Sequence, residues 1–149
     1  IVITGDHGEE FQEKGLWGHG SAFYHEEQMR VPLVLHIPGK TPAEINEVSS
    51  HLDVPATVYE ALGVTAPSNT YSQGKSLLGN TRRDFIVAAE WDTMMYADKD
   101  YKIVFPFRGE ELEKIATTDD LPVKNSDQIL KEKNPQLLNI LKDMRKFLR

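Results

Sequence analysis

A short apolar run opens the chain and constrains its fold more than any other feature. Residues 1–4 (IVIT) are all β-branched, which is typical of a strand buried on both faces of a mostly parallel sheet. The run stops, without a helix signal, at residues 5–8 (GDHG). In open α/β sheets, ligands bind in the crevice outside the carboxyl ends of the strands. The sequence therefore predicts an α/β fold with a functional site at residues 5–8.

Asp6 and His7 bring two kinds of metal ligand to this strand end. A carboxylate oxygen beside an imidazole nitrogen suits zinc or manganese, and calcium if the histidine swings away. The alternative is an aspartate that caps a turn beside a solvated histidine. Gly5 and Gly8, which let the backbone turn tightly, favour the metal site. A divalent ion normally takes four or more ligands, so the remaining ligands are expected from outside this chain.

Further motifs follow in a characteristic order. Residues 4–20 read TGDHGEEFQEKGLWGHG and residues 23–39 read FYHEEQMRVPLVLHIPG. LDVPAT at residues 52–57 and GKSLL at residues 74–78 come next. In this order the motifs closely resemble the sulfatase branch of the alkaline phosphatase superfamily. The resemblance covers roughly the first half of the chain, and the second half carries no motif that matches.

The resemblance implies the C-terminal part of an alkaline-phosphatase-like α/β/α sandwich over residues 1–80. A small antiparallel sheet with a C-terminal helix is expected over residues 81–149, with the boundary near residues 79–83. Because the chain begins inside a strand and without Met, it is expected to be a fragment. In the family, the missing N-terminal half carries a hydroxyl or formylglycine nucleophile and the other metal ligands. The fragment alone is therefore expected to be inactive.

His19 is the candidate catalytic and substrate-binding residue, and it lies between Gly18 and Gly20. Arylsulfatase-type members commonly have a lysine in this region, whereas phosphoethanolamine and phosphoglycerol transferase relatives carry a histidine. The resemblance thus tilts towards the transferase-like branch. When protonated, His19 could bind a sulfate or phosphate oxygen or donate a proton to the leaving group. The alternative is a loop histidine whose neighbours merely permit an unusual backbone.

Three other residues in this segment are weaker candidates. Lys14 could bind the anionic part of a substrate, or be a solvated loop lysine. Ligating histidines usually donate a hydrogen bond from their second nitrogen to a carboxylate or carbonyl, so Glu9 or Glu10 could orient His7 or hydrogen-bond the groups around the metal. Both glutamates could equally be solvated. Scaffold roles are expected for the rest: Trp17 packing the loop, Arg30 pairing with Glu26 or Glu27, and His36 and His51.

Secondary structure can be predicted for the remainder. Residues 30–36 predict a second buried strand. Asp53 is expected to N-cap a helix with Pro55 in its first turn, an apolar stripe at Val54, Val58, Ala61 and Leu62, and an end at Gly63. Strands are expected at residues 85–89, 93–97 and 101–105, and a strand or a helix at 110–117. A terminal helix is expected from Pro135 onward, with apolar positions at Leu137, Leu138, Leu141, Met144 and Leu148.

Composition excludes several classes of protein. A net charge of −6 and a pI near 5.3 argue against nucleic-acid binding. Without cysteine, the chain has no disulfide and no thiol nucleophile. No apolar run approaches the roughly twenty residues of a membrane span.

The sequence therefore predicts part of a metal-dependent enzyme that hydrolyses or transfers a sulfate or phosphate ester. By resemblance, the protein is periplasmic or otherwise extracytoplasmic, and tethered to the inner membrane through the missing N-terminal part. Two rivals are a non-catalytic periplasmic module that binds a partner or a lipid, and a complete small binding domain with an accidental Asp-His-Gly. The intact Asp6, His7 and His19 argue against the first, and the long run of motifs argues against the second.

Overall fold

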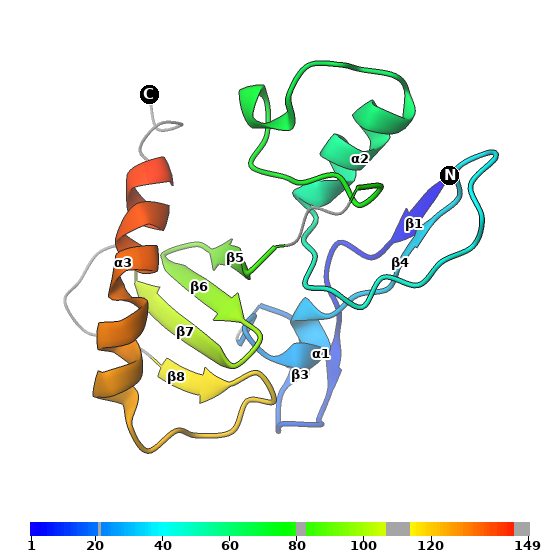
Figure 1. Ribbon diagram of the computed structural model, residues 1–149. Coiled ribbons are helices and arrows are strands. Elements are labelled where there is room, and N and C mark those ends of the chain that lie inside the picture. The colour runs from blue at the N-terminus through cyan, green and yellow to red at the C-terminus, as the bar shows by residue number, and fades with distance from the viewer. Residues whose placement is uncertain (21, 80–82, 107–113, 145–149) are drawn as a thin grey trace. The chain divides into compact units, whose positions relative to one another are not determined.

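The computed structural model describes residues 1–20, 22–79, 83–106 and 114–144. It divides into two compact units, Ile1–Ile86 and Val87–Arg149, which are considered separately (Figure 1). The boundary that the sequence predicts at residues 79–83 includes residues 80–82, which lie outside the described ranges.

The first unit begins with a two-stranded antiparallel sheet. Strand β1 (Val2–Thr4) pairs with β4 (Leu33–Leu35), and Val2 lies opposite Leu35. Ile3 and Val34 face each other across this pair and are 62% and 55% exposed. The expectation of two buried strands in a mostly parallel sheet is therefore wrong for this chain. A β-branched run favours extended backbone, but which strand pairs with it and what covers its faces depend on distant residues.

A short hairpin and a single helical turn follow β1. Strands β2 (Glu10–Phe11) and β3 (Trp17–Gly18) pair with Phe11 opposite Trp17, and α1 spans Glu26–Met29. Arg30 Nε donates to Glu26 Oε2 over 2.7 Å, which confirms the expected pairing. Trp17, however, is 72% exposed, so the prediction that it packs the loop is wrong.

Helix α2 (Asp53–Ala61) and the 3₁₀ turn η1 (Ser68–Thr70) complete the first unit. The helix ends before Gly63, whose φ of 82° is the left-handed conformation that glycine adopts readily. The predicted apolar stripe is wrong, because the buried residues are Asp53, Ala56 and Thr57 whereas Leu62 is 75% exposed. The predicted N-cap is also wrong: Leu52 is the N-cap and has no side-chain capping bond.

Asp53 joins three separate segments instead of capping the helix. Its carboxylate accepts the backbone N–H groups of Ser50 (2.8 Å) and Lys75 (2.7 Å). Arg83 donates from Nε over 3.1 Å and from Nη2, and the aspartate is only 1% exposed. Burial alone would raise the pKa of Asp53, but the Arg83 hydrogen bond and these backbone donors outweigh it and lower the pKa.

Asp53→Ala is expected to lower the free energy of unfolding by about 3 kcal/mol, because it leaves Arg83 uncompensated near a buried site. Because the folded pKa is lowered, the carboxylate stabilises the fold above the unfolded pKa of about 3.9, and this contribution is lost as the pH falls through the folded pKa. Asp53→Asn should therefore flatten the acid limb of the stability curve. Urea unfolding at several pH values tests this, with Asp92→Ala in the exposed turn between β5 and β6 as the control. Equal effects of Asp53→Ala and Asp92→Ala would contradict it.

The second unit is built on an antiparallel sheet. Its strands lie in the order β5 (Phe85–Glu90), β6 (Thr93–Asp98), β7 (Tyr101–Pro106) and β8 (Lys114–Thr117). The three predicted strands and the small antiparallel sheet are confirmed. At residues 110–117 the described part is a strand, whereas residues 110–113 lie outside the described ranges. The most deeply buried side chains come from the two central strands: Met94, Met95, Ile103 and Val104.

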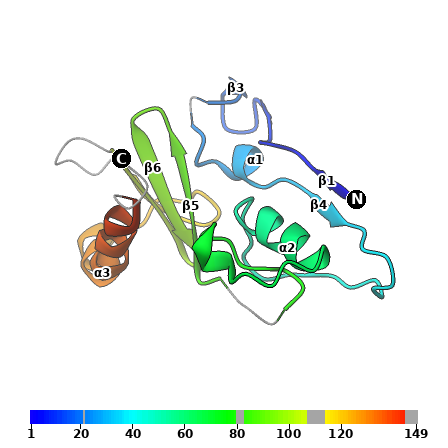
Figure 2. The ribbon, with the colours of Figure 1, turned by 90° about the horizontal axis from the view of Figure 1, so that it is seen from above.

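Helix α3 (Ser126–Met144) runs alongside this sheet (Figure 2). Lys133 on the helix pairs with Asp98 at the end of β6 over 2.8 Å. The helix is confirmed, but its predicted start at Pro135 is wrong, because the proline lies inside it. Its buried residues are Ile129, Leu137 and Ile140, whereas Leu138 and Leu141, predicted on the apolar stripe, are exposed, and Leu148 lies outside the described ranges. Among the described residues, no helix is long and apolar enough to span a membrane.

Candidate active site

The loop that follows β1 brings two potential metal-ligand atoms close together, His7 Nε2 and Asp6 Oδ2. His7 Nδ1 lies 2.9 Å from the carbonyl oxygen of Gly8. A carbonyl only accepts, so this contact assigns the hydrogen of a neutral ring to Nδ1 and leaves Nε2 with a free lone pair. Nε2 lies 3.7 Å from Asp6 Oδ2. Two ligands that each bind zinc at about 2.1 Å are at most about 4.2 Å apart, so Asp6 and His7 fit one shared divalent ion.

Asp6 is in the ionised form that metal binding requires. Its own backbone hydrogen bond, followed by the charge that His7 carries when it is protonated and the backbone N–H of His7, lowers the pKa of this exposed carboxyl group. The His7 N–H lies 3.2 Å from Asp6 Oδ1. Because that contact uses Oδ1, Oδ2 stays directed towards the His7 ring.

His19 lies directly against His7, with ring centroids 3.9 Å apart and planes inclined by 35°. Its Nδ1 lies 3.1 Å and 3.2 Å from the two carboxylate oxygens of Glu9. An ionised carboxylate only accepts, so His19 donates from Nδ1, and Nε2 stays available to another group. Gly18 and Gly20, with φ of 94° and 99°, supply left-handed backbone on both sides of the histidine. The structure thus brings together Asp6, His7 and His19, the three principal site residues predicted from sequence.

The two glutamates form different contacts from those that the sequence suggested. Glu9 hydrogen-bonds His19, not His7. The ligand atoms of His7, Glu9 and His19 nevertheless lie within 4.8 Å of one another, so these three could also share an ion. Glu10 is fully buried. Its carboxylate accepts hydrogen bonds from His25 Nδ1 over 3.1 Å and from Gln28 Nε2 over 2.6 Å.

Gln28 was not identified from sequence, yet it holds both site loops. Its backbone carbonyl accepts the N–H of Gly8 over 2.7 Å, and its side-chain oxygen accepts the N–H of Gly20 over 2.8 Å. A Cβ at Gly8 would lie 1.9 Å from the carbonyl oxygen of Glu27, so only glycine allows α1 to approach this closely. The requirement for glycine after His7 is therefore close packing. The contacts of Gln28 join it to Gly8 and Gly20, which are distant in sequence, so no local pattern predicts this role.

His51 and Lys14 also contact the site segment. His51 Nε2 lies 2.9 Å from the carbonyl oxygen of Gly5, so this residue, assigned to scaffold, supports the loop just before Asp6. Lys14 Nζ lies 2.9 Å from Glu27 Oε2, and both side chains are 26% exposed. This ion pair offsets much of the charge that Lys14 would offer to an anion, and its proposed role in substrate binding stays a prediction.

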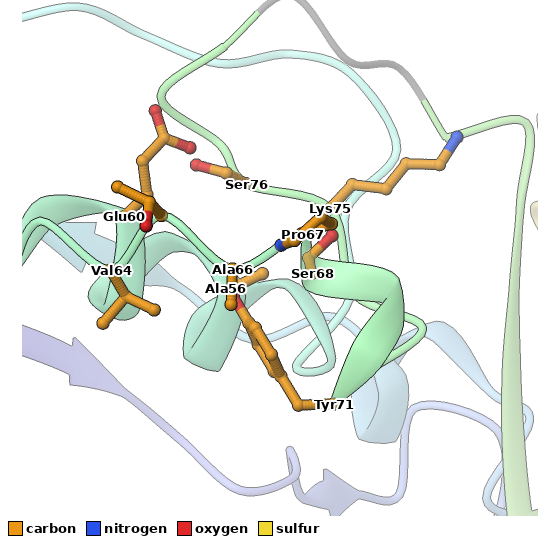
Figure 3. A pocket seen from close by; sticks show the side chains of 10 residues that line it. Ala56, Glu60, Val64, Ala66, Pro67, Ser68, Tyr71, Lys75 and Ser76 are labelled. Carbon is orange, nitrogen blue, oxygen red and sulfur yellow. The ribbon is translucent and has the colours of Figure 1, made fainter.

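A separate open cavity of about 310 Å³ lies beside α2. Figure 3 shows its lining, to which Glu60, Tyr71 and Ser76 contribute. Its lining residues all fall between Ala56 and Ser76, so it includes none of the predicted site residues.

Comparison with known proteins agrees with the motifs in the first half of the chain. Residues 1–64 match the family model described as Sulfatase. The structure described as BT4656 in complex with its substrate D-glucosamine-2-N,6-O-disulfate is similar over 98% of this chain and 34% of that chain. The TM-score is 0.60 and the sequence identity is 19%. The α/β fold class is thereby confirmed, and so is the resemblance to the sulfatase family.

The chain is also similar in sequence to an inner membrane protein of two bacteria. Inner membrane protein YejM of Salmonella typhimurium (strain LT2) is 30% identical over 125 residues, which cover 80% of this chain and 20% of the relative. YejM of Salmonella typhi matches with the same figures. This chain therefore spans about a fifth of the length of these curated relatives.

Proposed function

We propose that this chain is part of a metal-dependent enzyme that hydrolyses or transfers a sulfate or phosphate ester. The observation that carries the proposal is the convergence of Asp6, His7 and His19, with Nε2 of His7 3.7 Å from Asp6 Oδ2 and the two imidazole rings 3.9 Å apart. In this proposal, Asp6 and His7 hold a divalent ion of manganese, zinc or calcium. When bound, such an ion neutralises charge on the oxygens of the transferred group.

The protein side chains supply the remaining functions that this chain can provide. Glu9 fixes the ring of His19, and Nε2 of His19 either binds an ester oxygen or gives a proton to the leaving group. Gln28 holds the loops of His7 and His19 in place through its hydrogen bonds to the backbone N–H groups of Gly8 and Gly20. The nucleophile and the other metal ligands come from the rest of a longer protein.

The proposed substrates are sulfate or phosphate esters, and the histidine at position 19 favours the transferase-like branch. BT4656 has a sulfated sugar as its substrate, and YejM is an inner membrane protein. The first supports an enzyme that acts on an anionic ester, and the second supports attachment to the inner membrane outside this chain. The extracytoplasmic location stays a prediction.

The full-length protein is expected to turn over aryl phosphate or aryl sulfate when manganese, zinc or calcium is added. Asp6→Ala should abolish this activity, because it removes a metal ligand that the fold cannot replace. Asp92→Ala, an exposed aspartate between β5 and β6, serves as the matched control. This chain alone should have no appreciable activity in the same assay. Turnover by the isolated chain, abolished by Asp6→Ala, would contradict the missing nucleophile, and a full-length protein without turnover would support the non-catalytic module.

A further inference from the structure

Two pairs of side chains contact each other on one face of the β2–β3 hairpin. The register places Glu10 opposite Gly18 and Phe11 opposite Trp17, and Glu9 and Phe11 flank the buried Glu10. Glu9 hydrogen-bonds His19 at 3.1 Å, and the rings of Phe11 and Trp17 meet edge to face at 5.5 Å. Glu10 points to the opposite face, where it is buried.

The aromatic pair is therefore close to the anion site. Glu9 and Phe11, and likewise Trp17 and His19, are two residues apart, a separation that the backbone can span over at most about 7 Å. The ester oxygen of a sulfate or phosphate group bound at His19 would cover only part of the distance from His19 to the aromatic pair. The carbon group attached to that oxygen could therefore reach Phe11 and Trp17.

Both aromatic rings are exposed in this chain. Phe11 is 61% and Trp17 72% exposed, whereas the opposite face of the hairpin is anchored by the buried Glu10. Aromatic side chains of this kind each offer 150–250 Å² for burial, which makes them effective contacts for an apolar ligand group.

The charges beside the pair indicate which kind of group would be bound. Glu13 accepts the backbone N–H of Phe11, and Glu9 lies at the other end of the same face. These carboxylates would repel a second anionic group, so an uncharged apolar group is favoured over a multiply sulfated one.

We propose that Phe11 and Trp17 form a subsite for an uncharged apolar group attached to the ester oxygen, so that the substrates are sulfate or phosphate esters of apolar alcohols. This inference rests on the proposed anion-binding role of His19. It adds the specificity of the site for the alcohol portion of the substrate.

The test measures binding of two non-cleavable anions, methylphosphonate and benzylphosphonate, to the metal-loaded full-length protein by calorimetry. The parent protein is expected to bind benzylphosphonate about tenfold more tightly. Trp17→Ala and Phe11→Ala should each remove most of this preference while leaving the affinity for methylphosphonate unchanged. Trp91→Ala, which removes a 95% exposed tryptophan from the second unit, is the matched control and should keep the preference.

The possible failures can be told apart. Equal binding of both phosphonates by the parent, or a preference that survives Trp17→Ala and Phe11→Ala, would overturn the apolar subsite but leave the anion site intact. His19→Ala should weaken the binding of both phosphonates. If methylphosphonate does not bind, or binds equally well to His19→Ala, the proposed anion site fails and the subsite fails with it.

Discussion

In the full-length protein, His7→Ala is expected to lose bound metal and turnover together. The ring holds its hydrogen on Nδ1 against Gly8, so Nε2 is the atom that faces Asp6 Oδ2 at 3.7 Å. Removing the ring removes one of two ligands that this chain contributes to the proposed site. Since metal ions supply several kcal/mol of charge stabilisation, turnover should fall on the order of a thousandfold or more.

Metal content by elemental analysis and steady-state kinetics on the same preparations would test this prediction. His36→Ala, which removes an exposed histidine just after β4, is the matched control. A His7→Ala protein that retains the metal and the activity of the parent would show that His7 only shapes the turn.

His19→Ala is expected to slow turnover by roughly a hundredfold or more, the usual scale for an acid–base or electrostatic contact. Metal content should stay near that of the parent, because Nδ1 of His19 is engaged by Glu9 and the ring stacks on His7 without sharing its contact to Asp6.

Parallel measurements of turnover number and metal content decide among three roles. If His19→Ala also strips the metal, the group of His7, Glu9 and His19 is the ligand set, since their ligand atoms lie within 4.8 Å of one another. If neither quantity changes, His19 is only part of the glycine-rich loop. His36→Ala again controls for loss of an exposed histidine.

Asp6, His7 and His19, which the sequence indicates as site candidates, lie close together in the structure, but the sequence did not predict the contacts that connect them to their neighbours. Asp6 and His7 were identified because a strand stopped at a glycine-flanked pair of ligand types, and His19 because glycines flank it. The partner of Glu9 could not be read from spacing, since His19 is ten residues away and approaches only when the hairpin closes. The role of Gln28 depends on two separate loops meeting one short helix.

In the scaffold, too, the sequence predicted local structure better than contacts between distant segments. Short apolar runs separated by turn residues located the strands of the second unit, because these patterns are local in the sequence. Pairing was harder: residues 1–4 were correctly expected to contain a strand but wrongly expected to be buried in a parallel sheet. Asp53 was assigned to a helix cap because capping is local, whereas its partners Lys75 and Arg83 are distant in sequence.

The sequence by itself determined which chemical groups this protein carries and where its chain turns. Side-chain type, glycine placement and short-range periodicity are local properties, and they define Asp6, His7 and His19 as candidates without reference to the fold. Only the tertiary structure decided which of these groups meet, which carboxylate is buried, and which aromatic rings stay exposed. Contacts between segments arise when hairpin, helix and loops pack together, and the free energy of that packing depends on all the segments at once.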